Sequence, residues 1–207
     1  MLKISYGWGI NDSMVPVSSW VDGKRIVDPY YKRWASLLER CYSHKYKANR
    51  PAYDGVYCSE KWKYLSDFKM WADEQPYWQS LSLDKDLLVK GNKEYGPDTC
   101  AFVPQYLNSV LQVQNNNGSY LLGVAKTPIG KYKAQIKVDG EPKHLGHYST
   151  MYEAHAVWQV AKAYAIECAV TRYAKEPWFR TDVADALMSR IWELRLNHAQ
   201  GVVTTEL

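Results

Sequence analysis

The sequence predicts an α+β fold: a small ββα-type module with flanking helices, then a three-stranded antiparallel sheet packed on a helix, then a helical tail. Apolar side chains recur at three- and four-residue spacing in residues 31–41 and 62–71, which is typical of helices with one buried face. Residues 131–138 alternate between polar and apolar side chains, as a half-buried strand does. Thr150 and Glu153 form a capping box, which predicts the start of a further helix.

Breaks rich in Gly, Pro and Asn divide the 207 residues into segments, and this length allows one large domain or two small ones. We expect an N-terminal extension (1–28), a compact module (29–112), a linker (113–118), a second domain (119–170) and a C-terminal helical tail (171–207). The tail is expected to fray from Val202 onward.

The first helix belongs to the compact module, after an N-terminal extension that holds one expected hairpin through residues 20–26. A second helix through residues 62–71 is expected to end before Pro76. The side chains that share the buried face of the first helix are Tyr31, Trp34, Leu37, Leu38 and Cys41.

Two short strands and a helix complete the module. The strands are expected over residues 81–87 and 99–103, joined by the polar loop 90–98. Pro104 suits the first turn of a helix, which we expect to run to about Leu111.

The second domain is expected to form a meander of strands over residues 121–125, 131–138 and 143–148. Asp139-Gly140 predicts a two-residue turn between the last two strands. Cys168, inside the following helix, is expected in the core. The helix face expected to pack on the sheet consists of Ala154, Val157, Ala161 and Tyr164.

The charge of this domain gathers on one face of the sheet. Residues 119–149 hold five lysines against Asp139 and Glu141, although the formal net charge of the chain is only +4. Such lysines can neutralise DNA phosphates, or they can serve solubility and oppose edge pairing. The face that the alternation leaves exposed carries Lys131, Lys133, Gln135 and Lys137, to which the register could add Lys126, Lys143 and His144.

Membrane and secretory signals are missing from the sequence. No apolar run reaches about 18 residues, and the N-terminus lacks the apolar stretch of a signal peptide. We therefore expect no membrane partner and a cytoplasmic location. There, the four cysteines are expected to be thiols or metal ligands rather than disulfides.

Several ordered motifs of the second domain resemble an AP2-type DNA-binding domain. The motifs are Leu122-Gly-Val124, Lys131-Tyr-Lys-Ala-Gln-Ile136, His144-Leu-Gly-His-Tyr-Ser-Thr150, Glu153-Ala154 and Ala161 to Tyr164. The resemblance implies that the sheet, rather than the helix, contacts DNA. That family's strands are usually rich in arginine, whereas these are rich in lysine, which lacks the guanidinium fork. Phosphate contacts are therefore favoured over base-specific ones.

The compact module resembles phage HNH-type (His-Me finger) proteins, which are often encoded with AP2-like domains and interpreted as homing-type endonucleases. The order of the motifs carries this resemblance. The motifs are Leu83-Asp-Lys-Asp86, Lys90-Gly-Asn-Lys93, Tyr95-Gly-Pro-Asp-Thr-Cys100, Phe102-Val-Pro104 and Asn108, preceded by segments 34–42, 53–58 and 62–68.

Catalysis in that family needs a divalent metal ion on the scissile phosphate and a base that activates water. By resemblance, Asp84 stands in the acidic position and Asn108 on the helix, but Lys85 replaces the histidine base. Lysine is a poor base unless its pKa falls far below about 10.4. Asp86 could instead activate water or bind Mg²⁺. Alternatively, Asp84 and Asp86 cap the loop and Lys85 contacts a phosphate.

Cys41, Cys58 and Cys100 fall in the HNH-like motifs, and with His44 they could form a zinc site of three cysteines and one histidine. The spacing lacks a CxxC pair, which is the strong indication of zinc. Cysteines on apolar faces are more often small core residues, so both interpretations remain open.

Three functions are compatible with these features. The first is a Mg²⁺-dependent DNA endonuclease with an AP2-like targeting domain. The second is a catalytically inactive DNA-binding or regulatory protein built from the same parts. The third is a phage effector that binds a host protein. Duplex DNA is the expected partner, and a homodimer is compatible with the apolar face of the last helix.

Overall fold

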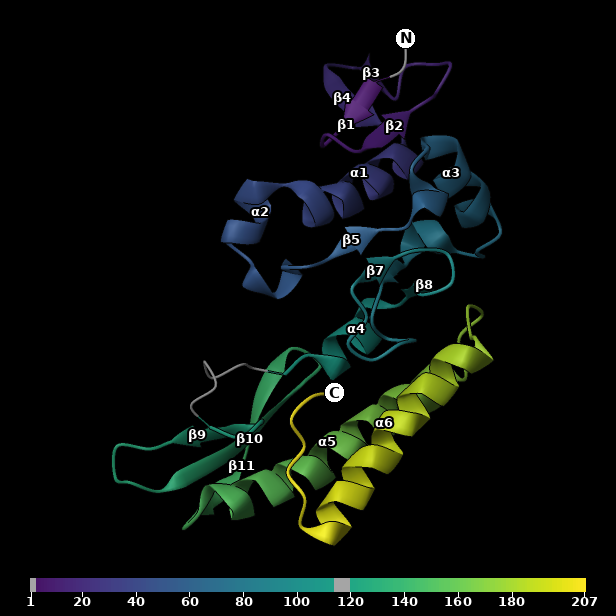
Figure 1. Cartoon of the computed structure of the whole chain (residues 1–207). Helices are drawn as coiled ribbons and strands as arrows, with labels where there is room; N and C mark the ends of the chain where they lie inside the picture. The colour runs from purple at the N-terminus through teal and green to yellow at the C-terminus, as the bar shows by residue number, and fades with distance from the viewer. Residues whose placement is uncertain (1–2, 114–119) are drawn as a thin grey trace. The chain divides into compact units, whose positions relative to one another are not determined.

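The computed structural model describes residues 3–113 and 120–207 and is an α+β fold (Figure 1). It divides into two compact units, Met1–Phe102 and Val103–Leu207. Apart from Val113, the predicted linker 113–118 lies outside the described residues. The helices are α1 (Pro29–Tyr42), α2 (His44–Ala48), α3 (Leu65–Asp73), α4 (Gln105–Leu111), α5 (Met151–Tyr173) and α6 (Thr181–Gln200).

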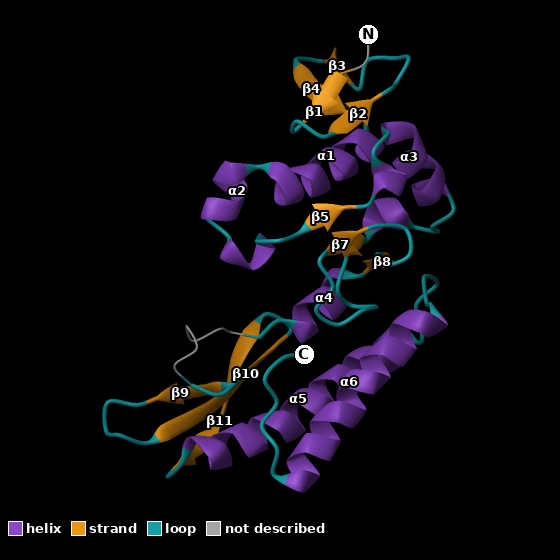
Figure 2. Cartoon of the chain, in the orientation of Figure 1, coloured by secondary structure: helices purple, strands orange, loops and turns teal. Residues whose placement is uncertain are grey.

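Most strands are short and form several small sheets, and the two longest strands, β10 and β11, belong to the second unit (Figure 2). The strands of the first unit are β1 (Lys3–Ser5), β2 (Gly9–Asn11), β3 (Ser18–Val21), β4 (Lys24–Val27), β5 (Tyr57–Cys58), β6 (Ser82–Asp84), β7 (Glu94–Tyr95) and β8 (Ala101–Val103), whose last residue, Val103, already belongs to the second unit. Those of the second unit are β9 (Val124–Lys126), β10 (Tyr132–Val138) and β11 (Glu141–Tyr148).

The N-terminal extension contains two hairpins, β1–β2 and β3–β4. The second is the predicted one. Its turn residues Asp22 and Gly23 both have positive φ, 49° and 73°, which the Asp-Gly pair tolerates.

The core of the first unit forms where α1 packs on α3. The predicted face of α1 buries Trp34, Leu37, Leu38 and Cys41, while Tyr31 is half-buried. Asp28 caps this helix by accepting a hydrogen bond from the Tyr31 N–H. The second predicted helix begins later than expected, at Leu65. Trp62 belongs to the preceding 3₁₀ turn, Glu60–Trp62, and is still 1% exposed.

The first unit also contains two pairs of short strands. The predicted pair is present as β6–β8, shorter than expected. The polar loop between them also contributes β7, which pairs in parallel with β5. The predicted helix after Pro104 is α4, which belongs to the second unit.

The second unit holds the predicted three-stranded antiparallel sheet, in the order β11–β10–β9. The Asp139-Gly140 turn joins the two long strands, with φ values of 51° and 88°. The capping box at Thr150 and Glu153 is also present. The sheet packs on α5 through a core of Val124, Ala134 and Ala154.

The expected buried face of α5 was wrong in part. Val157 and Ala161 are only half-buried, Tyr164 is 66% exposed, and Cys168 is exposed rather than in the core. The reason is that α5 packs on the sheet and also on α6, so its buried positions do not follow a single stripe.

The C-terminal residues do not fray as expected. Helix α6 ends at Gly201, which adopts a left-handed conformation with φ 66°. The chain then returns along α5, where Thr204 is 1% exposed. In the described part of the chain, none of the helices is long and apolar enough to cross a membrane.

Candidate nucleic-acid interface and nuclease-like loop

The sheet of the second unit has two different faces. Residues directly opposite each other in an antiparallel pair project from the same face. Ala134 and Ile136, on the central strand β10, are buried, at 0% and 6% exposed. Lys133, Gln135 and Lys137 alternate with them and therefore project from the opposite, outer face.

The register assigns the neighbouring side chains to one face or the other. His147 lies opposite Lys133, and His144 lies opposite Gln135, so both histidines belong to the outer face. Lys126 pairs with Tyr132, and Lys143 pairs with Ile136. These two lysines are exposed but project from the side that faces α5, so the register does not add them to the outer face.

A close packing contact fixes the sheet on α5. Gly123 precedes β9 with a φ of 75°, and a Cβ there would lie 1.9 Å from the Trp158 ring. Trp158, on α5, is 2% exposed and stacks on His155. Only glycine therefore lets the first strand approach the helix this closely. The inner face is covered by α5 as a result, whereas the outer face is not packed on that helix.

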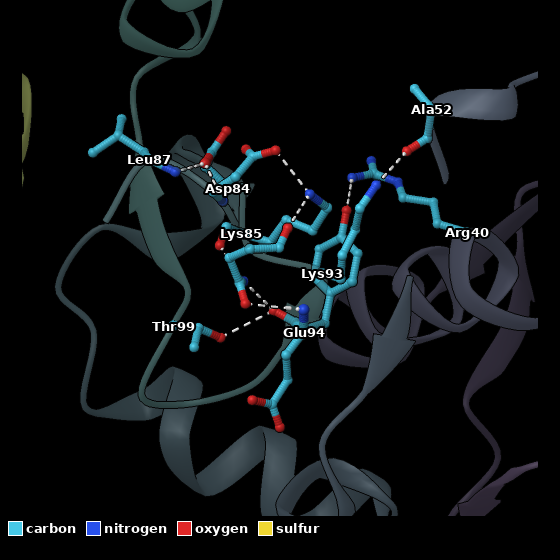
Figure 3. Close-up of polar contacts among 11 residues, drawn as sticks. Arg40, Ala52, Asp84, Lys85, Leu87, Lys93, Glu94 and Thr99 are labelled. Atoms are coloured by element: carbon cyan, nitrogen blue, oxygen red, sulfur yellow. Dashed lines mark hydrogen bonds and ion pairs between the residues drawn. The ribbon is translucent and has the colours of Figure 1, made fainter. Parts of the chain in front are cut away.

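In the first unit, Asp84 closes the loop that follows β6 (Figure 3). One Asp84 carboxylate oxygen accepts hydrogen bonds from the backbone N–H groups of Leu87 at 2.7 Å and Asp86 at 3.0 Å. Burial and the nearby Asp86 charge raise the pKa of Asp84 to about 6, against the lowering effect of the two amides. Asp84 thus caps the loop, which agrees with the Asp84 part of the interpretation in which both aspartates cap it.

Lys85 is also part of the loop structure. Its side chain is only 11% exposed, and its ammonium donates to the Asp86 carboxylate at 2.7 Å and to the Asn92 carbonyl at 2.9 Å. Asp86 therefore pairs with this lysine. The Asp86 side chain is 52% exposed while it makes this pair.

Asn92 and Thr99 hold the other side of this loop. The Asn92 side-chain amide donates to the carbonyls of Lys85 and Glu94, and its oxygen accepts from the Glu94 N–H. The Thr99 hydroxyl donates to the Glu94 carbonyl at 3.0 Å (Figure 3). Polar side chains of the HNH-like motifs thus satisfy the backbone of the loop itself.

Asn108, the remaining predicted catalytic residue, lies half-buried on α4 in the second unit. The hydrogen-bonded group that forms in the first unit consists of Asp84, Lys85 and Asp86.

The proposed zinc ligands separate into buried and exposed residues. Cys41, Cys58 and Cys100 are buried, and burial raises the pKa of Cys41 and Cys100 to about 12. His44 is exposed on α2. Among residues 3–113 and 120–207, no three His, Cys, Asp or Glu side chains are placed to hold a metal ion. With His44 exposed and the three cysteines buried, these four side chains are not arranged as a zinc site in the described part of the chain.

His147 is the residue of the outer face that the sequence pattern missed. Strict alternation puts His144 and His147 on opposite faces, because they are three residues apart. A signal was nevertheless present: Gly146 inside a strand is typical of a β-bulge.

The sequence matches no protein-family model, and neither a curated protein nor a solved structure matches the chain.

Proposed function

We propose that this chain binds duplex DNA through the outer face of its three-stranded sheet and does not cleave it with the loop at residues 84–87. The contrast between the two sheet faces carries the proposal. The inner face is sealed against Trp158, whereas Lys133 and Lys137 project outward from the central strand. Lys131 adds an exposed charge just before that strand.

The shape of the sheet supports insertion into a groove. Strand β9 pairs only with residues 132–134 of β10, whereas β10 and β11 continue together to the Asp139-Gly140 turn. The sheet therefore ends in a two-stranded ribbon. The major groove of B-DNA, about 12 Å wide, admits such a ribbon.

The charge pattern supports phosphate contact. Lysine ammonium groups act as point charges that displace condensed counterions from DNA, so binding weakens as salt rises. The resemblance of residues 119–170 to AP2-type domains supports the same surface. A protein partner in place of DNA is the competing function, and it requires that duplex DNA does not bind.

The lack of cleavage rests on the loop in the first unit. A general base needs an accessible atom at hydrogen-bond distance from water, and a catalytic metal needs open oxygen ligands. The buried Asp84 carboxylate instead accepts two backbone N–H groups, and the Asp86 carboxylate, although its side chain is 52% exposed, is paired with the Lys85 ammonium.

Two matched double variants test the interface. Lys133→Gln with Lys137→Gln removes two charges from the outer face, and Lys126→Gln with Lys143→Gln removes two exposed charges from the side that faces α5. Affinity for a fluorescent duplex is measured at several salt concentrations. The outer pair is expected to reduce the slope of log affinity against log salt by roughly two, since each phosphate contact contributes about 0.9. The Lys126→Gln with Lys143→Gln variant is expected to change this slope little.

Equal effects of the two pairs would mean that only the net charge of the domain matters, and the assigned face would be wrong. Absence of duplex binding by the unaltered chain would reject the function itself.

A further inference from the structure

We propose that His144 and His147 are base-contacting residues of this interface, and that the β-bulge at Leu145 exists to bring both onto the outer face. This inference rests on the proposed function and adds the residues that give it sequence preference. The lysines of the same face contribute affinity, and the histidines contribute discrimination.

Strand β11 contains a β-bulge. The register passes from Ala134 opposite Gly146 to Gln135 opposite His144, so Leu145 is one residue more than β10 can pair. Leu145 packs with the core below the sheet. Because of this extra residue, positions 144 and 147 share a face although they are three apart.

Two contacts hold the bulge in place. Gly146 has a φ of 128°, and a Cβ there would lie 2.8 Å from the Tyr148 hydroxyl. That hydroxyl donates a hydrogen bond to the Leu145 carbonyl at 2.9 Å. The position of the two histidines is therefore fixed by the fold before any partner binds.

The two imidazole rings form a pair on the exposed surface. Their centroids lie 4.5 Å apart, with the ring planes tilted by 56°. Both residues are exposed. Successive base pairs are separated by about 3.4 Å along the duplex, so two rings at this spacing can meet the edges of adjacent base pairs. The spacing of the two rings therefore suits contact with two successive base pairs better than contact with a single base.

The chemistry of imidazole suits this role. A neutral imidazole offers one N–H donor and one acceptor nitrogen, and base edges in the major groove present both kinds of group. Lys133, on the neighbouring strand, lies directly opposite His147. Its ammonium group can pair with any phosphate, whatever the base sequence. The outer face therefore combines lysines on the central strand with two imidazoles on the edge strand, which can hydrogen-bond to base edges.

The experiment selects bound sequences from a pool of random duplexes. It compares the unaltered chain, His144→Ala, His147→Ala, the double variant and Lys133→Gln as the control. Circular dichroism and thermal unfolding verify that each variant is folded. The histidine variants are expected to lose about tenfold or more of the preference for selected over random duplex. Their affinity for random duplex should remain within about threefold of the unaltered chain's value.

Lys133→Gln is expected to show the reverse pattern, weaker binding to every duplex with the same selected sequences. Unchanged selection by the double histidine variant would overturn the inference while leaving the proposed function intact. Selection of no preferred sequence by the unaltered chain would also overturn it. Failure of the unaltered chain to bind any duplex would reject both the inference and the proposed function.

Discussion

The imidazole Nε2 of His155 accepts a hydrogen bond from the backbone N–H of Thr204 at 3.0 Å. The other ring nitrogen, Nδ1, lies 2.9 Å from the Leu122 carbonyl and must donate to it. One neutral tautomer satisfies both contacts. A histidine on α5 thereby joins the start of the sheet to the C-terminal residues.

Acid is therefore expected to loosen the C-terminal residues. Burial lowers the pKa of His155 below its usual 6.5. The unfolded chain then binds more protons than the folded chain just below pH 6.5, so stability falls as pH decreases through that window. The protection factor of the Thr204 amide, which is its intrinsic exchange rate at each pH divided by the observed rate, should fall between pH 7 and 5.

A His155→Gln variant keeps a donor and an acceptor but does not titrate, so the protection factor of its Thr204 amide should change far less over the same range. His198→Gln, at an exposed position, serves as the control and should behave like the unaltered chain. An equal fall of the Thr204 protection factor in all three proteins would contradict this prediction.

Asp84 is expected to make stability depend on pH in the opposite direction. Its pKa is raised to about 6 in the folded chain, so the folded state binds more protons than the unfolded state between about pH 4 and 6. Its contribution to stability is present below pH 4 and is lost as pH rises through 6. Asn at this position keeps the oxygen acceptor without the charge.

Urea unfolding of the Asp84→Asn variant should give a free energy of unfolding at pH 8 that is equal to the original or higher, by at most about 3 kcal/mol. The pH dependence between 4 and 6 should become flatter. A marked loss of stability at pH 8 would show that the charged carboxylate is needed for the amide contacts.

The elements that sequence patterns predicted well are those fixed by neighbours along the chain. The apolar spacing around Trp34 gave α1, and Asp139-Gly140 gave the hairpin turn, because each depends on local backbone preferences. The capping box at Thr150 was correct for the same reason.

The features that the sequence did not predict depend on distant partners. Parallel pairing of β5 with β7 joins residues far apart in the chain. Tyr164 was expected in the core because the pattern was interpreted with a single buried face on α5. That helix packs both on the sheet and on α6, so its buried residues do not form one stripe. Likewise, His147 was missed because the bulge reverses the alternation. The sequence pattern therefore predicted Lys133, Gln135 and Lys137 on the outer face, and His144 as a possible addition, but not His147. Lys126 and Lys143, the other two possible additions, project from the side that faces α5.

Substitution of Gly123 by Ala should strongly destabilise the second unit. The residue has a left-handed φ, and the added Cβ would overlap the Trp158 ring at 1.9 Å. Backbone strain and overpacking together should lower the free energy of unfolding by about 2–4 kcal/mol. Gly130→Ala is the matched control, because Gly130 has a φ of 81° and no atom within 4 Å of the added Cβ. Gly130→Ala should lower the free energy of unfolding by only about 1 kcal/mol, because it introduces backbone strain without a steric overlap. Similar losses in the two variants would refute the packing argument.

Lys162 is expected to make the second unit more stable as pH rises above 8. It lies on α5, is 2% exposed, and donates to the carbonyl of Gln112 at the end of α4. Burial lowers the pKa of Lys162 to about 8 from 10.5. Between these values the unfolded state binds more protons, so stability should rise by at most roughly 3 kcal/mol. In Lys162→Met this rise should disappear, whereas Lys126→Met, at an exposed position, should retain it. A rise of unchanged size in Lys162→Met would assign it to other groups.

A plasmid-cleavage assay tests whether the loop at residues 84–87 takes part in DNA hydrolysis. Supercoiled plasmid is incubated with the unaltered chain, Asp84→Ala and Asn108→Ala in the presence of Mg²⁺ or Mn²⁺. We expect no nicking above background by any of the three, because Asp84 is engaged by the amides of Asp86 and Leu87 and Lys85 is bound to Asp86. The same proteins should still shift the mobility of the plasmid, since the lysines of the sheet are intact. Nicking by the unaltered chain that disappears in Asp84→Ala would contradict this prediction. It would mean that the loop opens when DNA and metal bind, and that Asp84 acts in catalysis after all.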